Sequence, residues 1–398
     1  MPLGEKNGET SGAAIAKTIA GNRGIDVHPV RTRRQWKFFH GLPARIQSDA
    51  SNWIQPLSLQ SRQLWAPRHP FFRHARATAW LATRGGVPVG RISAQVDALQ
   101  AECGRPTMGQ FGQLEAIDDP AVFRALTDAA GGWLVDQGMT EVTGPFDLSI
   151  NQQCGLLVDG HDQAPMMMMN YNPPWYPAHL EAAGFETAVE TLAYRGSPRY
   201  ELPTRVARML GRASRRLEIR PVTRSEIGSL AEPMRRIFNA AWAANWGFVP
   251  LTEAEFEHMV DEMKLLLRPG YVQVAAIDGE LVGFIVALPD LNELVADLRG
   301  RLFPFGAPRL LWRIARKSNR RARIPLMGIL PSHQQSFMGA AISYALIEAV
   351  ARSLIEDGIE VTEQSWILAD NKGMRSIVEA IGMKVAQRFR IYRKALAA

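Results

Sequence analysis

The chain has 398 residues, of which 46% are apolar and 21% are charged. This composition is that of a folded globular protein, and the length suits two domains better than one. The net charge of +7 favours an acidic partner, such as a phosphorylated cofactor, an anionic lipid or a nucleic acid, without deciding among them. Cys103 and Cys154 lie far apart and match no metal spacing, so we expect free thiols and no metal site.

The N-terminal segment, residues 1–24, has early acidic residues and no apolar core of signal-peptide length. It is predicted to be a disordered tail. No uninterrupted apolar run along the chain approaches the roughly 18 residues that span a bilayer. We therefore expect a cytoplasmic protein whose contact with the inner membrane, if it has one, is peripheral.

From residue 25 onward the chain repeats itself. The strand pattern "IDVHPV" returns as "LEIRPV", and the hairpin pattern "AWLATRGGVPVGRISAQVD" returns as "VQVAAIDGELVGFIVALPD". Each copy continues with an amphipathic helix ended by a glycine, Gly138 or Gly358, and closes with a helix, a glycine and a strand. Matches in one order at near-constant spacing predict two copies of one α/β unit, residues 25–198 and 199–398.

Between Asn151 and Gly184 the first copy carries an insertion that the second copy lacks, and the four methionines of "APMMMMNYNPPWYPAHLEAAGF", which starts at residue 164, lie in or beside it. If residues 166–169 form a short strand, alternate methionines point to opposite faces, so that at least two are buried in the sheet. The other two would then face the groove between the copies, where flexible thioethers suit an acyl chain.

The second copy carries its own insertion, residues 291–323, in which aromatic and aliphatic side chains precede a run of arginines. An apolar patch beside a cationic run is typical of a segment that lies in a membrane interface, so an anionic membrane surface is a candidate partner. A surface helix with a solvated basic end is the plainer alternative. We expect no nucleic-acid partner, because no nucleic-acid motif accompanies the charge.

The order of elements in each copy resembles the GNAT acyltransferase superfamily. The segments "NWGFVPLTEAEF", "LPDLN", "RIPLMGILP", "SWILADNKGM" and "YNPPWYPAHLEAAGF" are similar to those of bacterial tandem-GNAT proteins, a group that includes bacterial ceramide synthases. The resemblance implies an α/β (α+β) fold of two tandem domains, each a mixed, mostly antiparallel sheet flanked by helices. It also implies an acyl-CoA-dependent N-acyltransferase that acts on a lipidic amine such as a sphingoid base. An N-acetyltransferase for a small polar amine or peptide, and a non-catalytic binding protein with this fold, stay open as alternatives.

In GNAT proteins the coenzyme A pyrophosphate rests on backbone N–H groups where the fourth strand meets its helix. Small residues there let the backbone approach phosphate closely. The first copy has Asp118 and Asp119 at this position, so we predict that it is degenerate and that the second copy holds the site. The resemblance then implies cofactor contacts from Met327, Gly328, Ile329, Gln335, Ser336, Gly339, Ala340, Ala341 and Asn371. Asn371 is equally suited to capping the following helix.

The same resemblance supplies candidates for catalysis. Glu363 on the fifth strand is the first candidate for the general base, and His333 beside the predicted thioester is the second. The tyrosine that usually protonates the leaving thiol is replaced by Val378. Tyr344, Tyr392 or a water molecule stays open as its substitute.

The acceptor wall is expected from the residues before and after the second hairpin. Aromatic rings beside polar side chains suit an amphipathic acceptor with an apolar chain and a polar head. A domain-interface cluster is the alternative. The predicted substrate-binding residues are Asn239, Trp242, Asn245, Trp246, Phe248, Asp290 and Asn292.

Overall fold

The computed structural model describes residues 24–397. The predicted tail, residues 1–24, lies outside this range except for Gly24. The N-terminal half contains strands β1 (Ile25–Pro29), β2 (Ala75–Arg84), β3 (Val87–Asp97), β4 (Met108–Ala116), β5 (Glu141–Gly144), β6 (Leu156–Asp159) and β7 (Glu186–Gly196). Its helices are α2 (Arg33–Ile46), α3 (Ser58–Gln63), η1 (Pro70–Arg73), α4 (Leu99–Glu102), α5 (Pro120–Asp136) and α6 (Tyr176–Ala182).

The C-terminal half follows with the same order of elements and adds a helical insertion. Its strands are β8 (Leu217–Pro221), β9 (Val272–Ile277), β10 (Glu280–Pro289), β11 (Arg321–Ile329), β12 (Val361–Leu368) and β13 (Lys384–Ala395). Its helices are α7 (Thr204–Ala213), α8 (Ile227–Trp242), α9 (Glu253–Met263), α10 (Leu291–Val295), η2 (Ala296–Leu298), α11 (Gly306–Ala315), α12 (Phe337–Glu356) and α13 (Lys372–Ala380). Mixed sheets flanked by helices confirm the predicted fold class. The division at residues 198 and 199 stays a prediction.

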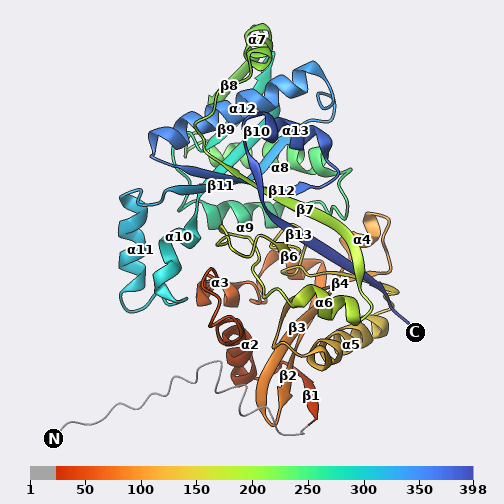
Figure 1. Ribbon diagram of the computed structural model, residues 1–398. Coiled ribbons are helices and arrows are strands. Elements are labelled where there is room, and N and C mark those ends of the chain that lie inside the picture. Colours follow the sequence, from red (N-terminus) through yellow and green to blue (C-terminus); the bar gives the residue numbers. More distant parts are fainter. Residues whose placement is uncertain (1–23, 398) are drawn as a thin grey trace, which may run out of the picture.

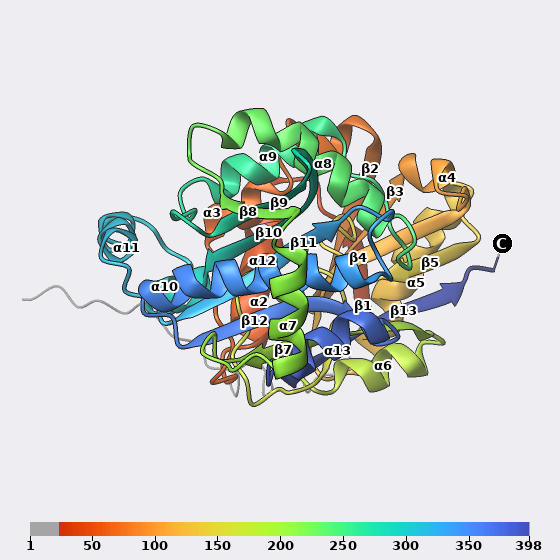
Figure 2. The same cartoon turned by 90° about the horizontal axis from the view of Figure 1, so that it is seen from above.

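The two halves share one sheet because they exchange their last strands. The strand order is β1-β2-β3-β4-β5-β13-β7-β12-β11-β10-β9-β8, and β6 pairs with β13 outside this path. Thus β13, the last strand of the chain, lies beside β5 of the N-terminal half, while β7 lies beside β12 of the C-terminal half. In Figures 1 and 2, β7 and β13 run together through the middle of the molecule. Neither half completes its sheet without the other.

Helices cover both faces of the sheet, as the alternation of side chains along the strands requires. In β2, Trp80 packs into the cluster under α5, whereas Leu81 packs against α2. In β10, Ile285 packs against α12, and Phe284 packs against α8 and α9. The two cores therefore lie on opposite faces of each half-sheet.

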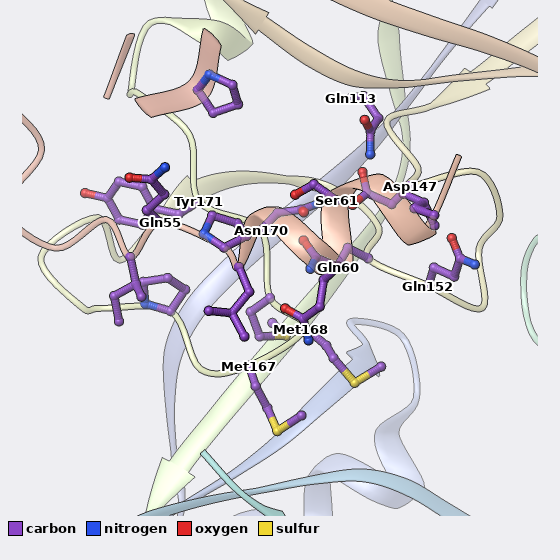
Figure 3. A pocket seen from close by; sticks show the side chains of 18 of the residues that line it. Gln55, Gln60, Ser61, Gln113, Asp147, Gln152, Met167, Met168, Asn170 and Tyr171 are labelled. Carbon is purple, nitrogen blue, oxygen red and sulfur yellow. The ribbon is translucent and has the colours of Figure 1, made fainter. Parts of the chain in front are cut away.

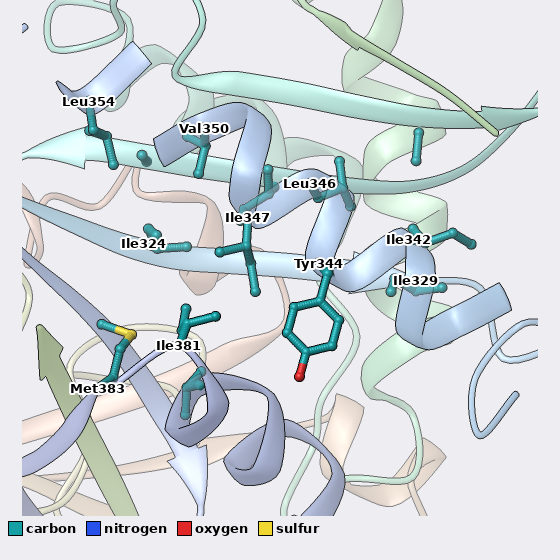
Figure 4. Packing of buried hydrophobic residues seen from close by; sticks show 14 of the residues in the cluster. Ile324, Ile329, Ile342, Tyr344, Leu346, Ile347, Val350, Leu354, Ile381 and Met383 are labelled. Carbon is teal, nitrogen blue, oxygen red and sulfur yellow. The ribbon is translucent and has the colours of Figure 1, made fainter. Parts of the chain in front are cut away.

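Helix α12 lies at the centre of the C-terminal core, where its side chains meet those of β11 and α13 (Figure 4). Within residues 24–397 it is the one helix that is long and apolar enough to cross a membrane by length and composition. More than half of that stretch is buried inside the fold. Its apolar character is thus accounted for by core packing.

The four methionines do not form a strand. Residues 165–170, which we call the Met segment, have turn and irregular backbone, and Met168 has a positive φ of 61°. Met166 and Met169 pack against Phe389 of β13, whereas Met167 joins the cluster of α8 and α9. Three of the four are buried, and Met168 is half-buried. The strand alternation expected from the sequence is wrong here, because these residues have turn and irregular backbone and pair with no strand.

Candidate functional site

The junction of β11 with α12 forms a tight turn with a capped helix start. The Ser336 hydroxyl accepts a hydrogen bond from the N–H of Gly339 at 3.0 Å and donates one to the His333 carbonyl at 2.6 Å. A Cβ on Gly339 would lie 2.2 Å from that carbonyl oxygen, so no other residue fits there without moving the loop. Gln335 and Ser336 are exposed, Ala340 is half-buried, and Ala341 faces the core. The predicted small residues therefore do let two backbone segments meet at the mouth of the helix.

Strand β11 separates from β12 before it reaches this turn. The two strands pair only from Arg321 to Ile324, so Met327, Gly328 and Ile329 lie where the strands have diverged. The Trp242 indole donates to the Met327 carbonyl at 3.3 Å, and α8 packs over Gly328. The structure thus brings together the predicted strand residues, the helix mouth and one aromatic residue of the predicted acceptor wall.

The corresponding mouth in the N-terminal half is filled by its own carboxylates. Asp119 accepts from the N–H of Ala121 at 2.8 Å and pairs with Arg84 at 2.5 Å. Asp118 pairs with His179 at 2.6 Å. These contacts occupy the helix start with anions of the protein itself.

Glu363 lies at the base of the gap between β11 and β12 and is fully buried. Its carboxylate accepts from the Arg195 Nε at 2.8 Å and from the Ser365 hydroxyl at 2.7 Å. Arg323, also fully buried, lies 3.7 Å away, and burial lowers the pKa of its guanidinium to about 10. Arg323 donates to the Met167 carbonyl at 3.1 Å. The carboxylate thus lies between two arginines and holds them beneath the Met segment.

Asp290 and Asn292 also contact the Met segment. Asp290, fully buried, caps α10, accepts from the N–H of Met167 at 2.9 Å and pairs with Arg321 at 2.9 Å. Burial raises the pKa of Asp290 to about 6. The Asn292 amide donates to the Pro165 carbonyl at 3.1 Å. Both side chains therefore position the segment.

The other acceptor-wall candidates lie around the loop between α8 and α9. The Asn239 amide bonds both ways with the Leu251 backbone, at 2.9 and 3.0 Å, and so anchors this loop. Trp246 packs against the cluster of Phe146, Cys154 and Ile391, between the halves. Phe248 is buried in the cluster of α8 and α9, and Asn245 is half-buried, with its backbone N–H bonded to Trp242.

Tyr392 is not brought to the predicted cofactor mouth. Because β13 is exchanged, this tyrosine lies in the core of the N-terminal half, where it is fully buried and donates to Glu181 at 3.2 Å. Burial raises its pKa to about 12. Its counterpart in the repeat, Tyr194, lies instead in the C-terminal core beside the cluster of α12. Asn371 caps α13 by accepting from the N–H of Met374 at 3.0 Å.

A cavity of about 310 Å³ lies between the halves, and of its polar residues only Asn292 was predicted from the sequence. Strands β4 and β5 pair only as far as Gln110 and Thr143, and beyond that point Glu115 and Asp147 line the cavity. In Figure 3, Asp147 lies with Gln113 and Gln152 toward one side, and the thioethers of Met167 and Met168 lie below. The wall is completed by residues of α3 and α10, so both halves contribute.

Glu115 is nearly buried and is held by neutral donors. It accepts from the Tyr176 hydroxyl at 2.8 Å and from the Gln47 amide at 3.2 Å. Burial raises the pKa of Glu115 to about 7 and that of Asp147 to about 6. Arg91 is the strand partner of Glu115 on β3, and its guanidinium donates to the Phe39 carbonyl at 2.8 Å.

The strand pairings of the structure show which residues of the second copy correspond to these carboxylates. Counted from the first paired residues of each parallel strand pair, Glu115 stands where the second copy has Gly328. Asp147 likewise stands where the second copy has Ile367. The polar gap therefore belongs to the N-terminal half alone. Within the described residues no cluster of potential metal ligands is present.

Comparisons with known proteins agree with this architecture. No family model matches the chain. It is 39% identical over 381 residues to the bacterial ceramide synthase of Caulobacter vibrioides, covering 94% of this chain and 98% of that one. It is 40% identical over 360 residues to protein YghO of Escherichia coli K12, covering 90% and 92%.

Among solved structures, a tandem GNAT protein from the clavulanic acid biosynthesis pathway superposes with a TM-score of 0.55 at 13% identity, covering 94% of this chain and 99% of that one. A GCN5-related N-acetyltransferase from Sphaerobacter thermophilus gives 0.52 at 11% identity, covering 94% and 96%. These structures share the fold. The chain belongs to the family of tandem-GNAT acyltransferases that includes the ceramide synthase of Caulobacter vibrioides.

Proposed function

We propose that the protein transfers an acyl group from acyl-CoA to the amine of a long-chain lipid, as a ceramide synthase of sphingolipid biosynthesis does. The observation that carries this proposal is the near-full-length similarity to the Caulobacter vibrioides enzyme. In the reaction the amine nitrogen bonds to the acyl carbonyl carbon, the carbon–sulfur bond breaks, and an amine proton leaves with the thiol.

The mouth of α12 fits the phosphate end of coenzyme A. The first-turn N–H groups of a helix have no intrahelical partner, and the helix dipole favours an anion there. Ser336 satisfies only one of them, that of Gly339. The loop from Leu330 to Ser336 contains no carboxylate, in contrast to the aspartates of the N-terminal half. The residues proposed to hold the cofactor are Met327, Gly328, Ile329, Gln335, Ser336, Gly339, Ala340 and Ala341.

Of the two predicted bases, His333 keeps the more suitable position. It lies half-buried in the loop at the helix mouth, whereas Glu363 is enclosed by Arg195, Arg323 and Ser365. A general base must reach the proton that it accepts. We propose His333 for this role and a structural role for Glu363.

The proposal predicts thiol release that depends on a lipidic amine. Purified protein incubated with sphinganine and a long-chain acyl-CoA should release free coenzyme A and form the N-acyl product, followed with a thiol reagent and by mass spectrometry. Acetyl-CoA with small polar amines should give at least tenfold less product. Turnover of the polar amines alone would favour an N-acetyltransferase, and no turnover with any amine would favour a binding protein.

The helical insertion presents an apolar and cationic surface suited to an anionic membrane. Phe303 and Phe305 are 82% and 81% exposed, and Leu311 and Trp312 of α11 are more than half exposed. The Arg316 guanidinium lies 4.8 Å from the Trp312 ring. In Figure 1, α11 stands at the edge of the C-terminal half, away from the sheet. We propose that this segment, residues 299–317, holds the protein peripherally on the inner leaflet.

The proposed membrane contact predicts sedimentation with vesicles. The protein should sediment with vesicles that contain phosphatidylglycerol and much less with pure phosphatidylcholine vesicles. Replacing both Phe303 and Phe305 by serine should reduce the bound fraction at least fivefold. The control is Leu265→Ser, which removes a 54% exposed apolar side chain outside the segment and should bind like the wild type. Equal binding to both kinds of vesicle, or wild-type binding by the double variant, would show that this surface does not hold the protein on a membrane.

A further inference from the structure

We propose that the cavity between the halves is a recognition site that binds the acceptor before it reaches the cofactor mouth, with Glu115 and Asp147 binding its ammonium group and the Met segment contacting its hydrocarbon chain. None of the residues proposed to hold the cofactor lines this cavity. This inference rests on the proposed function, because it takes the acceptor to be a lipidic amine. It gives the N-terminal half, which the filled helix mouth marks as unable to hold the cofactor, a task of its own.

The charge of the cavity matches one cation. Two carboxylates share the enclosed part of the cavity with one guanidinium, that of Arg91, and neither forms an ion pair within 4.0 Å among the described residues. A third lining carboxylate, that of Glu262, is more than half exposed and lies 3.5 Å from His258. His40 and His69 also line the cavity, but burial lowers their pKa values to about 4, so both are neutral near pH 7. With both carboxylates ionised, the enclosed groups carry one uncompensated negative charge, which a primary ammonium neutralises.

Two further observations indicate a ligand with polar atoms. Arg91 is more than nine-tenths buried, lines the cavity, and has a guanidinium Nε without a partner. A buried donor left unpaired costs about 1–3 kcal/mol, so such a group is expected to be satisfied when the site is filled. The Gln152 carbonyl oxygen, on the same side as Asp147 in Figure 3, is also without a partner. A hydroxyl next to the amine would bond with both kinds of group.

The rest of the wall mixes polar side chains, such as Gln55, Gln60 and Ser61, with apolar ones from both halves. Pockets for small ligands have volumes from about 300 Å³ upward, and this cavity lies at that lower limit. Thioether side chains adapt to chains of different shape. The apolar lining comprises Ile54, Leu57, Leu64, Met167, Met168, Met169, Leu291 and Val295.

The equivalent gap of the second copy lacks the carboxylates that would bind an ammonium group. Gly328 stands in place of Glu115, and Ile367 stands in place of Asp147. The buried carboxylate of that copy, Glu363, is neutralised by two arginines. The carboxylate pair is therefore present at the gap of the first copy and absent from the equivalent gap of the second copy.

The test measures amine binding without acyl-CoA, by isothermal titration of the full-length protein with sphinganine and with neutral N-acetylsphinganine. The wild type should bind the amine at least tenfold more tightly than the amide. The double variant Glu115→Gln, Asp147→Asn should lose this preference. Asp128→Asn, which removes an exposed carboxylate of α5, serves as the matched control and should retain it. Retained preference in a double variant with a wild-type circular dichroism spectrum would overturn the inference.

The pH dependence provides a second readout. The groups that face Glu115 are Arg91, Asp147, Tyr176 and Gln47. Of these four, only Asp147 changes charge between pH 6 and 8, and it does so at the lower end of that range. Since only ionised carboxylates attract an ammonium, affinity for sphinganine should fall at least tenfold from pH 8 to pH 5.5. The double variant should show a flat profile over this range. An equally steep profile in the variant would count against the carboxylates.

These measurements separate the inference from the proposed function. If the protein binds the amine through these carboxylates but transfers no acyl group, the proposed function is wrong and the recognition site stands. If the double variant transfers acyl groups to sphinganine with an unchanged KM for sphinganine, the proposed function stands and the recognition site is wrong.

Discussion

Deleting residues 384–398, which removes β13, is expected to unfold the N-terminal half of the protein. In the shared sheet β13 lies between β5 and β7, so its loss strips β5 of a neighbour. Phe389, Ile391 and Tyr392 are each at most 2% exposed, and burial of each such side chain stabilises by about 1.5–3 kcal/mol. The sum is comparable with the whole stability of a typical domain, about 5–15 kcal/mol.

Hydrogen exchange with mass spectrometry would show where the deletion acts. Peptides from β4, β5 and α5 should lose protection although they lie more than 200 residues before the deleted strand. Adding a synthetic peptide of residues 384–398 should restore protection, which controls for non-specific aggregation. Full protection of β4, β5 and α5 in the truncated protein would show that the strand exchange is not needed.

Replacing Glu363 by glutamine is expected to lower the free energy of unfolding by about 3–5 kcal/mol, because it leaves buried guanidinium groups without their counter-charge. Arg323 is fully buried, and Arg195 is largely so. Urea denaturation would measure the effect. The control is Glu360→Gln, which removes the exposed ion pair with Arg320 and should change stability by less than about 1 kcal/mol.

This substitution also tests the alternative that Glu363 is the general base. A catalytic role predicts that turnover falls strongly while the urea midpoint stays that of the wild type. The structural role predicts a lower midpoint, with activity lost in proportion to unfolding. His333→Ala should then lower kcat with little effect on stability, since the loop histidine is only half-buried.

The sequence predicted the fold class because the repeat reproduces a whole order of elements. It could not predict the strand exchange. The patterns of β7 and β13 are alike in the two copies, so pairing within a copy and pairing between copies satisfy the same alternation of side chains. Only the three-dimensional arrangement distinguishes them, and the exchange moves Tyr392 away from the copy to which its sequence assigns it.

The candidate site, like the fold, could be predicted only in part from the sequence. Residues at the start of α12 are contiguous, and their small size predicts a close backbone approach from the sequence alone. Glu115 and Asp147 come from separate strands that diverge, and a carboxylate on an alternating strand gives no sign of the cavity that it lines. Asp118 and Asp119 mark the filled helix start of the first copy, and Glu115 lies only three residues before them.

The Met segment makes the wall of the cavity sensitive to oxidants. Met168, half-buried and part of the lining, is the most accessible of the four thioethers. Oxidation to the sulfoxide turns an apolar side chain into a polar one, and reductases reverse it. Because Met166, Met167 and Met169 are buried, peroxide should modify Met168 of the lining first. Affinity for a hydrocarbon chain would then change before the fold does.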